Sequence, residues 1–171
     1  LLSYEFKSSA NIKNCPVQKV VSIQSLNKQI AERLSATEGI SKKPINILGC
    51  GALGSKISMN LARMGYTEQH LYDKDIILPH NLVRHYENRR SEVGASKANV
   101  MKTEMDCMFT SNSSSHFQNI FDIDILPDGL TVDCTASKRS LFWSVSREII
   151  KSPMLRTEIY LGGKMGLSLF E

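Results

Sequence analysis

The sequence predicts an α/β protein with a Rossmann-like, mainly parallel sheet, helices on both faces and an antiparallel edge at its C-terminal end. Short apolar runs of strand length alternate with longer segments in which apolar residues recur every three or four positions. One run, residues 45–48, leads straight into Gly49, and glycines follow at positions 51 and 54. Parallel strands joined by right-handed crossovers place such a turn at the carboxyl edge of the sheet.

Residues 1–44 are predicted to form an N-terminal extension, and residues 45–171 the nucleotide-binding core. In the extension we expect a strand over 17–23 and then an amphipathic helix that ends near Gly39. Leu26, Ile30 and Leu34 indicate the helix because they are spaced four residues apart.

In the core we expect two strand–helix units, a further strand, a strand–helix–strand unit and a final strand. The expected strands are 45–48, 70–73, 116–121, 130–133, 154–160 and 165–170, the last two joined at Gly162–Gly163. The expected helices carry apolar stripes that include Leu53 to Met64, Ala98 to Met108, and Leu141 to Ile149. A loop of about twenty residues after Asp73 is long enough to suggest a functional role.

Composition narrows the class of protein. The chain has 171 residues, 42% hydrophobic and 22% charged, which is typical of one globular domain. Its net charge of +4 suits an anionic ligand, and no basic run is interleaved with aromatic residues, so nucleic-acid binding is not expected. No apolar run approaches the roughly 18 residues that span a membrane, and a cytoplasmic location is expected.

The four cysteines do not form a metal or disulfide framework. They stand at positions 15, 50, 107 and 134 and lack CxxC spacing. Cys50 and Cys134 fall at strand ends and are expected to be small buried side chains.

The glycine turn is the first candidate binding feature. Gly49 permits a sharp turn, Gly51 lets a phosphate approach the backbone, and Gly54 lets the next helix pack closely on the strand. Ala52 and Leu53 lie between them, where a helix N-terminus offers free N–H groups to an anion. A bare glycine turn without a ligand is the alternative, but an acid 24 residues after Gly49 favours binding.

Polar residues after the second strand suggest which ligand binds. Asp73 ends that strand, where a carboxylate accepts hydrogen bonds from ribose hydroxyls. Asp75 is either a magnesium ligand or a solvated loop acid. Arg84 carries a forked guanidinium suited to phosphate oxygens, and Lys97 places a cation at a helix start, where the helix dipole disfavours it. Such a local conflict is expected at functional sites.

These motifs resemble the ThiF/MoeB/HesA family, the nucleotide-binding fold of ubiquitin-activating enzymes. The resemblance extends from the glycine turn through Asp-x-Asp, Asn-Leu-x-Arg and Gly-x-x-Lys to an Asp-Cys-Thr segment, in matching order and approximate spacing. It covers about three quarters of the chain. The segment Asn81–His85 looks most like bacterial members.

The resemblance implies ATP-dependent adenylation with Mg²⁺. The C-terminal carboxylate of a ubiquitin-like or sulfur-carrier protein would attack the α-phosphate, and pyrophosphate would leave. Asp73 would hold the ribose, Arg84 and Lys97 would be the catalytic phosphate contacts, and Asn81 would order the loop or touch phosphate. The resemblance also implies a homodimer or heterodimer.

The chain departs from the family pattern in ways that bear on function. A second Asp that often follows the Asp-Cys-Thr segment is replaced by Ala136, so Asp75 or Asp133 would have to hold the metal. No cysteine matches the family's thioester-forming position, and the core is expected to be truncated at its C-terminus.

Two other functions remain open at this stage. Ala136 is compatible with a catalytically degenerate subunit that pairs with an active partner. An NAD(P)-dependent oxidoreductase is also compatible with the glycine turn, and Lys74 beside Asp73 would suit NADP. That function leaves Arg84 and Lys97 unexplained.

Overall fold

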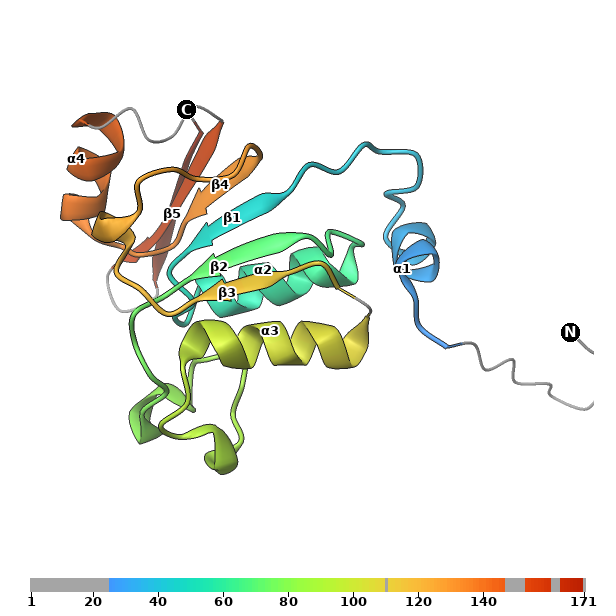
Figure 1. Cartoon of the computed structure of the whole chain (residues 1–171), viewed down its shortest axis with the longest axis horizontal. Helices are drawn as coiled ribbons and strands as arrows, with labels where there is room; N and C mark the ends of the chain where they lie inside the picture. The colour runs from blue at the N-terminus through green and yellow to red at the C-terminus, as the bar shows by residue number, and fades with distance from the viewer. Residues whose placement is uncertain (1–24, 110, 147–152, 161–163, 171) are drawn as a thin grey trace, which may run out of the picture.

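A computed structural model describes residues 25–109, 111–146, 153–160 and 164–170, and its centre is a mixed six-stranded sheet (Figure 1). The strand order is β3-β2-β1-β4-β5-β6, in which β1 to β5 run parallel and β6 pairs antiparallel with β5. The strands are β1 (Ile45–Leu48), β2 (Gln69–Tyr72), β3 (Ser114–His116), β4 (Leu130–Asp133), β5 (Met154–Tyr160) and β6 (Met165–Phe170). The predicted fold class, including its antiparallel edge, is confirmed.

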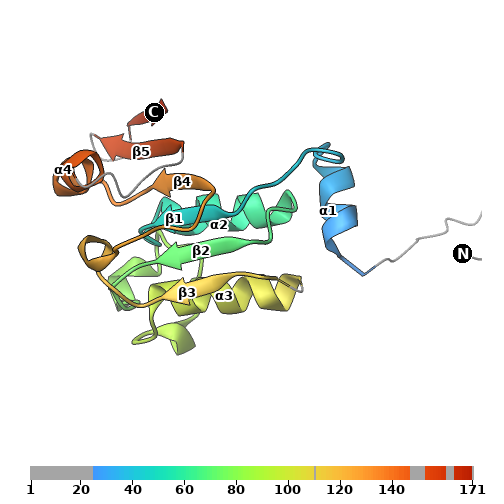
Figure 2. The ribbon, with the colours of Figure 1, turned by 45° about the horizontal axis from the view of Figure 1, so that its top comes forward.

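Helical segments cover both faces of the sheet, because the strands bury apolar side chains on both sides. Behind β1 to β3 in Figure 2 lie α2 (Gly54–Arg63) and α3 (Lys97–Met108). They share a core with Ile47 and Leu71. On the opposite face η4 (Ile120–Asp122) and α4 (Lys138–Ser146) pack on Leu48 and Tyr72. The alternation of Ile47 and Leu48 along β1 therefore supplies one residue to each core.

The predicted strand over 116–121 is wrong. The strand ends at His116, and the chain then turns into η4. Asn119 starts this turn because its side-chain oxygen accepts a hydrogen bond from the Phe121 N–H at 3.3 Å. Ile120 is then buried against α4, so an apolar run that suggested a strand instead packs as a single helical turn.

The N-terminal helix exists, but its predicted apolar face is wrong. In α1 (Lys28–Leu34) only Ala31 is buried, and Leu26 and Leu34 are 47% and 76% exposed. Ala31 packs into the core, and polar contacts hold the rest of this region: Lys42 pairs with Glu32 at 3.1 Å. In Figure 1, α1 lies at the end of the sheet opposite the carboxyl ends of the parallel strands.

Two other expectations concern residues outside the described part. The strand predicted over 17–23 and the turn at 162–163 both lie there. The pairing of Tyr160 with Met165 nevertheless confirms that the last two strands are antiparallel. The division of the chain at residue 44 stays a prediction. Within the described ranges, no helix is long and apolar enough to cross a membrane.

Truncating Met101 should destabilise the fold strongly. Its side chain is fully buried in α3 against the sheet. Met101→Ala should lower the free energy of unfolding by about 2–5 kcal/mol, because it leaves a cavity in a packed core. Urea denaturation measures this. The control Val83→Ala removes a side chain that is 88% exposed and should change stability by less than about 0.5 kcal/mol. Equal effects would contradict the packing described for α3.

Candidate functional site

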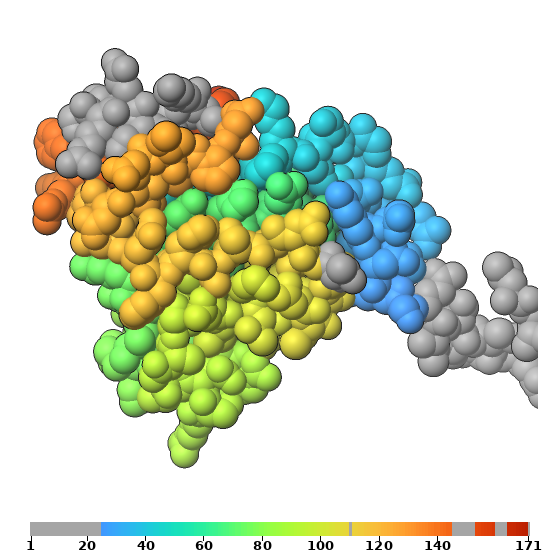
Figure 3. Space-filling view, viewed as in Figure 1, coloured from blue at the N-terminus to red at the C-terminus, as the bar shows by residue number. Residues whose placement is uncertain are grey.

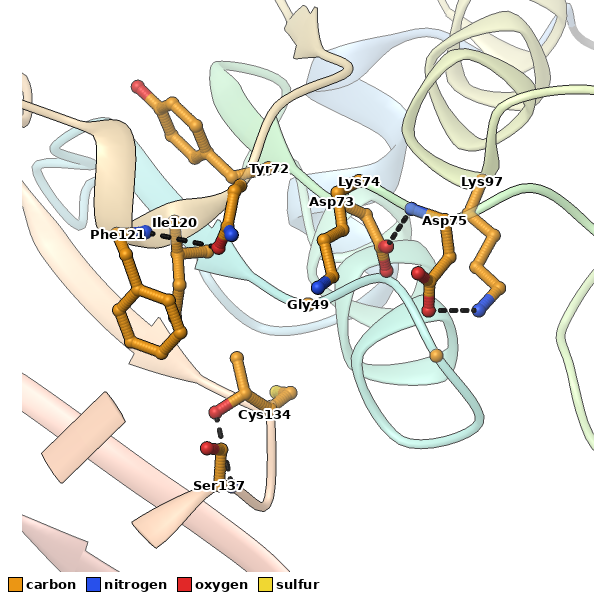
Figure 4. A pocket seen from close by; sticks show the side chains of 13 residues that line it. Gly49, Tyr72, Asp73, Lys74, Asp75, Lys97, Ile120, Phe121, Cys134 and Ser137 are labelled. Carbon is orange, nitrogen blue, oxygen red and sulfur yellow. Dashed lines mark hydrogen bonds and ion pairs between the residues drawn. The ribbon is translucent and has the colours of Figure 1, made fainter. Parts of the chain in front are cut away.

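A cavity of about 300 Å³ opens at the carboxyl ends of β1, β2 and β4 (Figure 4). Five segments form its walls: the glycine turn, the end of β2 with the residues after it, the start of α3, the η4 turn and the loop after β4. The lining residues are Gly49, Gly51, Tyr72, Asp73, Lys74, Asp75, Lys97, Asn119, Ile120, Phe121, Cys134, Thr135 and Ser137. Carboxyl ends of parallel strands are where open α/β sheets bind their ligands.

Each of the three glycines has a different structural role in the turn. Gly49 has φ +89°, a left-handed conformation that side chains disfavour. A Cβ on Gly54 would lie 1.9 Å from the Gly49 carbonyl oxygen, so only glycine lets α2 start this close to β1. A Cβ on Gly51 would meet nothing within 4 Å. Gly51 therefore leaves its backbone open toward the cavity, as expected for a residue that a ligand approaches.

The turn that leads into α2 has backbone N–H groups without acceptors in the described part of the chain, and Gly51 of this turn lines the cavity. Leu53 is the N-cap residue and makes no side-chain capping bond. Among the described residues, the N–H groups of Gly51, Ala52 and Leu53 have no acceptor. Free N–H groups at the positive end of a helix dipole form a binding site for anions.

Asp73 fastens the glycine turn to the end of β2. Its carboxylate accepts hydrogen bonds from the Cys50 N–H at 2.7 Å and the Asp75 N–H at 2.8 Å. The side chain is only 8% exposed, and this burial raises the pKa of the carboxyl. Each oxygen keeps a lone pair, so the carboxylate can still accept from a ligand hydroxyl on the cavity side.

Two lysines bring positive charge to the cavity. Lys97 begins α3, and its ammonium lies 3.1 Å from a carboxylate oxygen of Asp75, which relieves the predicted conflict with the helix dipole. Lys74 is exposed and has no hydrogen-bond or ion-pair partner in the described part of the chain. It therefore contributes an unneutralised charge at the cavity rim.

The long loop after β2 is tied to the glycine turn by His85. His85 is buried, and its Nε2 lies 2.8 Å from the Cys50 carbonyl oxygen. Its Nδ1 accepts from the Glu87 N–H at 3.1 Å, which leaves the proton on Nε2. Asn81 orders the start of the same loop, since its side-chain oxygen accepts from the Leu78 N–H. The space-filling view shows the rest of the loop projecting from the molecule (Figure 3).

Six predicted site residues lie outside the cavity lining: Ala52, Leu53, Gly54, Asn81, Arg84 and Asp133. Arg84 is exposed on the projecting loop. Asp133 is 2% exposed and binds Arg156 and Ser140 behind the cavity wall. In the described residues no group of three or more His, Cys, Asp or Glu side chains is placed to hold a metal ion. Of the two predicted metal ligands, only Asp75 faces the cavity.

The buried cysteines behave as expected. Cys50 is fully buried and Cys134 is 9% exposed. Burial raises the pKa of the Cys134 thiol to about 11 and that of Cys50 well above its ordinary value. Both therefore stay protonated and pack as small apolar side chains.

Sequence reasoning missed two walls of the cavity. The η4 turn contributes Asn119 and Phe121, which the sequence placed in a strand, and the loop after β4 contributes Thr135 and Ser137. The Asp-Cys-Thr segment was a signal for that loop, although not for which side chains face the cavity. For Lys74, the sequence suggested a role only in the alternative function, as a residue that would suit NADP.

The fold and the cavity define a Rossmann-like α/β protein with a site suited to an anionic ligand. Comparison with known families makes the assignment specific, since residues 22–118 match the ThiF family. This chain belongs to the ThiF family.

Individual relatives share part of the chain. The Nedd8-activating enzyme E1 catalytic subunit of Drosophila melanogaster is 35% identical over 85 residues, 49% of this chain and 19% of that protein. The ATP-dependent ubiquitin transferase-like protein Cap2 of Enterobacter hormaechei is 31% identical over 114 residues, 63% of this chain and 19% of Cap2. The matched region thus spans about a fifth of these relatives.

Solved structures agree with the fold. Escherichia coli MccB, in its crystal structure with AMPCPP and MccA, has a TM-score of 0.59 and 25% sequence identity. The similarity covers 77% of this chain and 38% of MccB.

Substitutions at two glycines of the turn should separate an effect on stability from an effect on ligand binding. Gly54→Ala should cost about 3 kcal/mol of unfolding free energy, because its Cβ would collide with the Gly49 carbonyl. Gly51→Ala should leave stability within about 0.5 kcal/mol but crowd the approach of a phosphate. Chemical denaturation and calorimetric titration with MgATP measure the two effects. A Gly51→Ala protein that binds MgATP as wild type does would argue against phosphate contact at this backbone.

Protonation of His85 should weaken the fold below neutral pH. Burial lowers the pKa of His85 below that of the unfolded chain. The unfolded state then binds more protons, so stability is fully present above the ordinary histidine pKa, about 6.5, and falls as pH decreases through it. Unfolding free energies at pH 7.5 and 5.5 measure this loss.

A glutamine at this position serves as the comparison. His85→Gln retains an N–H that can donate to Cys50 and should show a smaller loss between the two pH values. Burial also lowers the pKa values of His70 and His116, so part of the wild-type dependence should remain. An unchanged pH dependence in His85→Gln would contradict a titrating role for His85.

Proposed function

We propose that the cavity binds ATP and that the chain is the nucleotide-binding part of an enzyme that adenylates a terminal carboxylate. The observation that carries the proposal is the open N-terminus of α2 beside Gly51, adjacent to the buried carboxylate of Asp73. The N–H groups suit phosphate and the carboxylate suits ribose hydroxyls.

The relatives support a nucleoside triphosphate over a dinucleotide. Cap2 is described as ATP-dependent, and MccB was crystallised with AMPCPP, an ATP analogue. Lys97 and Lys74 supply cations where a triphosphate would lie. Lys74 would also suit NADP, but an NAD(P)-dependent oxidoreductase would leave Lys97 unexplained. We therefore assign phosphate contacts to both lysines; the predicted contact by Arg84, which does not line the cavity, stays a prediction.

The proposed reaction needs no general base. An ionised carboxylate oxygen attacks the α-phosphorus, a bond forms between them, and the bond from the α-phosphorus to the bridging oxygen of the β-phosphate breaks. Pyrophosphate leaves with the electron pair, and an acyl-adenylate remains. The protein's contribution is to position the nucleotide and to stabilise phosphate charge, through the N–H groups of Gly51 to Leu53 and the two lysines.

We propose that only one protein carboxylate, that of Asp75, binds Mg²⁺. Mg²⁺ in nucleotide sites is held by one or two carboxylates together with phosphate oxygens. Asp75 faces the cavity with a side chain that is 57% exposed, although one oxygen also contacts Lys97. Asp133 does not fit this role, because both its oxygens already accept hydrogen bonds from the protein.

For the acyl substrate we propose the C-terminus of a ubiquitin-like or sulfur-carrier protein, or of a peptide. The similarity to a Nedd8-activating enzyme subunit and to a ubiquitin transferase-like protein supports a protein, and the MccB–MccA complex supports a peptide. A homodimer or heterodimer is part of the same proposal.

The central experiment is equilibrium binding of MgATP and NADP⁺ to the full-length protein by calorimetry. We expect MgATP to bind more tightly. Lys97→Ala and Lys74→Ala should each weaken MgATP by about tenfold, the loss of one charge-assisted contact. Lys56→Ala, which removes an exposed lysine on α2, should not. Absence of MgATP binding, or tighter binding of NADP⁺, would overturn the proposal.

A second candidate function rests on Ala136, which stands where many family members carry an acid. A catalytically degenerate subunit would bind ATP with little dependence on Mg²⁺. Ala136 has φ +52°, a left-handed conformation that aspartate tolerates better than alanine, so Ala136→Asp should fold. A strong gain of Mg²⁺ dependence in Ala136→Asp, with none in wild type, would favour the degenerate subunit.

A further inference from the structure

A buried network lies directly behind one wall of the cavity, and Arg156 is at its centre. Arg156 stands on β5 beside Asp133 of β4 and is 5% exposed. Its Nη1 donates to Asp133 Oδ2 at 2.6 Å, and its Nη2 donates to the carbonyl oxygen of Ser137 at 2.8 Å. Its Nε donates to Glu158 Oε1 at 2.7 Å. One side chain thus joins two strands and the loop after β4.

The network uses the whole carboxylate of Asp133. Oδ2 accepts from Arg156 and from the Ser140 hydroxyl at 2.9 Å. Oδ1 accepts from both the N–H and the hydroxyl of Thr135, at 2.9 and 2.7 Å. A buried charge is costly unless it is paired and fully hydrogen-bonded, and this one is both. Removing Arg156 would leave the buried Asp133 carboxylate and the partly buried Glu158 carboxylate without their cation.

The loop that this network holds forms a wall of the cavity. Thr135 and Ser137 line the cavity, and Ala136 between them takes a left-handed conformation. The loop also packs against the glycine turn, since a Cβ on Gly49 would lie 3.3 Å from the Thr135 Cα. Arg156 itself does not line the cavity. It binds the loop from behind, at the Ser137 carbonyl, while Asp133 binds it at Thr135.

We propose that Arg156 is a positioning residue for nucleotide binding, which holds the 134–137 loop in the conformation that faces the ligand. The inference rests on the proposed function, because the ligand is the nucleotide assigned there. Neither the family match nor the relatives assign a role to this residue. A guanidinium is required, since a planar fork can serve Asp133, Ser137 and Glu158 together, whereas a lysine ammonium is a single point of charge.

The first measurement needs no ligand. Amide hydrogen exchange of Thr135 and Ser137 in the full-length protein reports the order of the loop. Arg156→Lys should speed this exchange by about tenfold, because it loses the contact with Ser137, and Ser140→Ala should act in the same direction. Both substitutions keep a cation at position 156, whereas Arg156→Met removes it. Arg156→Met is the third variant, measured if it folds.

The second measurement is the dissociation constant for MgATP, taken with the melting temperature of each variant. Arg156→Lys should weaken MgATP by about tenfold. Lys42→Met is the matched control, since the Lys42 side chain has the same 6% exposure and also pairs with a carboxylate, that of Glu32. Glu32 belongs to α1, which lies at the opposite end of the sheet. Lys42→Met should lower the melting temperature and leave MgATP binding unchanged.

The outcomes separate the two proposals. The positioning role is overturned if the Arg156→Lys and Ser140→Ala variants have the same loop amide exchange rates and the same dissociation constant for MgATP as wild type. If Lys42→Met weakens MgATP as much as Arg156→Lys does, the effect follows from general destabilisation and the role is likewise overturned. If wild type fails to bind MgATP, the proposed function fails, and the amide exchange still decides whether Arg156 orders the loop.

Discussion

The close approach of α2 to β1 is the constraint on which the site depends. Because Gly54 has no side chain, the first turn of α2 lies against the Gly49 carbonyl, and the N–H groups of Gly51, Ala52 and Leu53 just before it have no acceptor among the described residues. The surrounding segments are then fixed to this turn. Asp73 binds the Cys50 N–H, His85 binds the Cys50 carbonyl, and the loop after β4 packs against Gly49.

Charge is distributed around this turn in two layers. At the cavity, Asp75 and Lys97 pair, while Lys74 has no ion-pair partner in the described part of the chain, so its charge is available to a ligand. Behind the cavity wall, Arg156 neutralises Asp133 in a dry environment and serves the structure rather than the ligand. Two aspartates that look equivalent in sequence, Asp75 and Asp133, therefore have different roles, set by burial and by which cation lies within reach.

Sequence reasoning succeeded where a local pattern has one structural solution and failed where tertiary contacts choose. The run 45–48 followed by Gly49 correctly predicted a buried strand entering a tight turn. The run after His116 was assigned to a strand, yet Asn119 caps a helical turn there. An apolar stripe of Leu26, Ile30 and Leu34 predicted α1 to be amphipathic, but Leu26 and Leu34 are exposed, and the helix is held through Ala31 and polar contacts. Apolar periodicity indicates a helix without indicating what covers it.

The sequence by itself determined the Rossmann-like fold, the glycine turn and the place of Asp73, because backbone sterics and strand-to-helix connectivity leave few alternatives at those positions. Only the tertiary structure decided which polar residues meet. It turned Asp133 toward Arg156, 23 residues away in sequence, left Arg84 on the projecting loop, and brought Thr135 and Ser137 to the cavity. These outcomes depend on burial and on partners distant in the chain, which no local pattern of residues encodes.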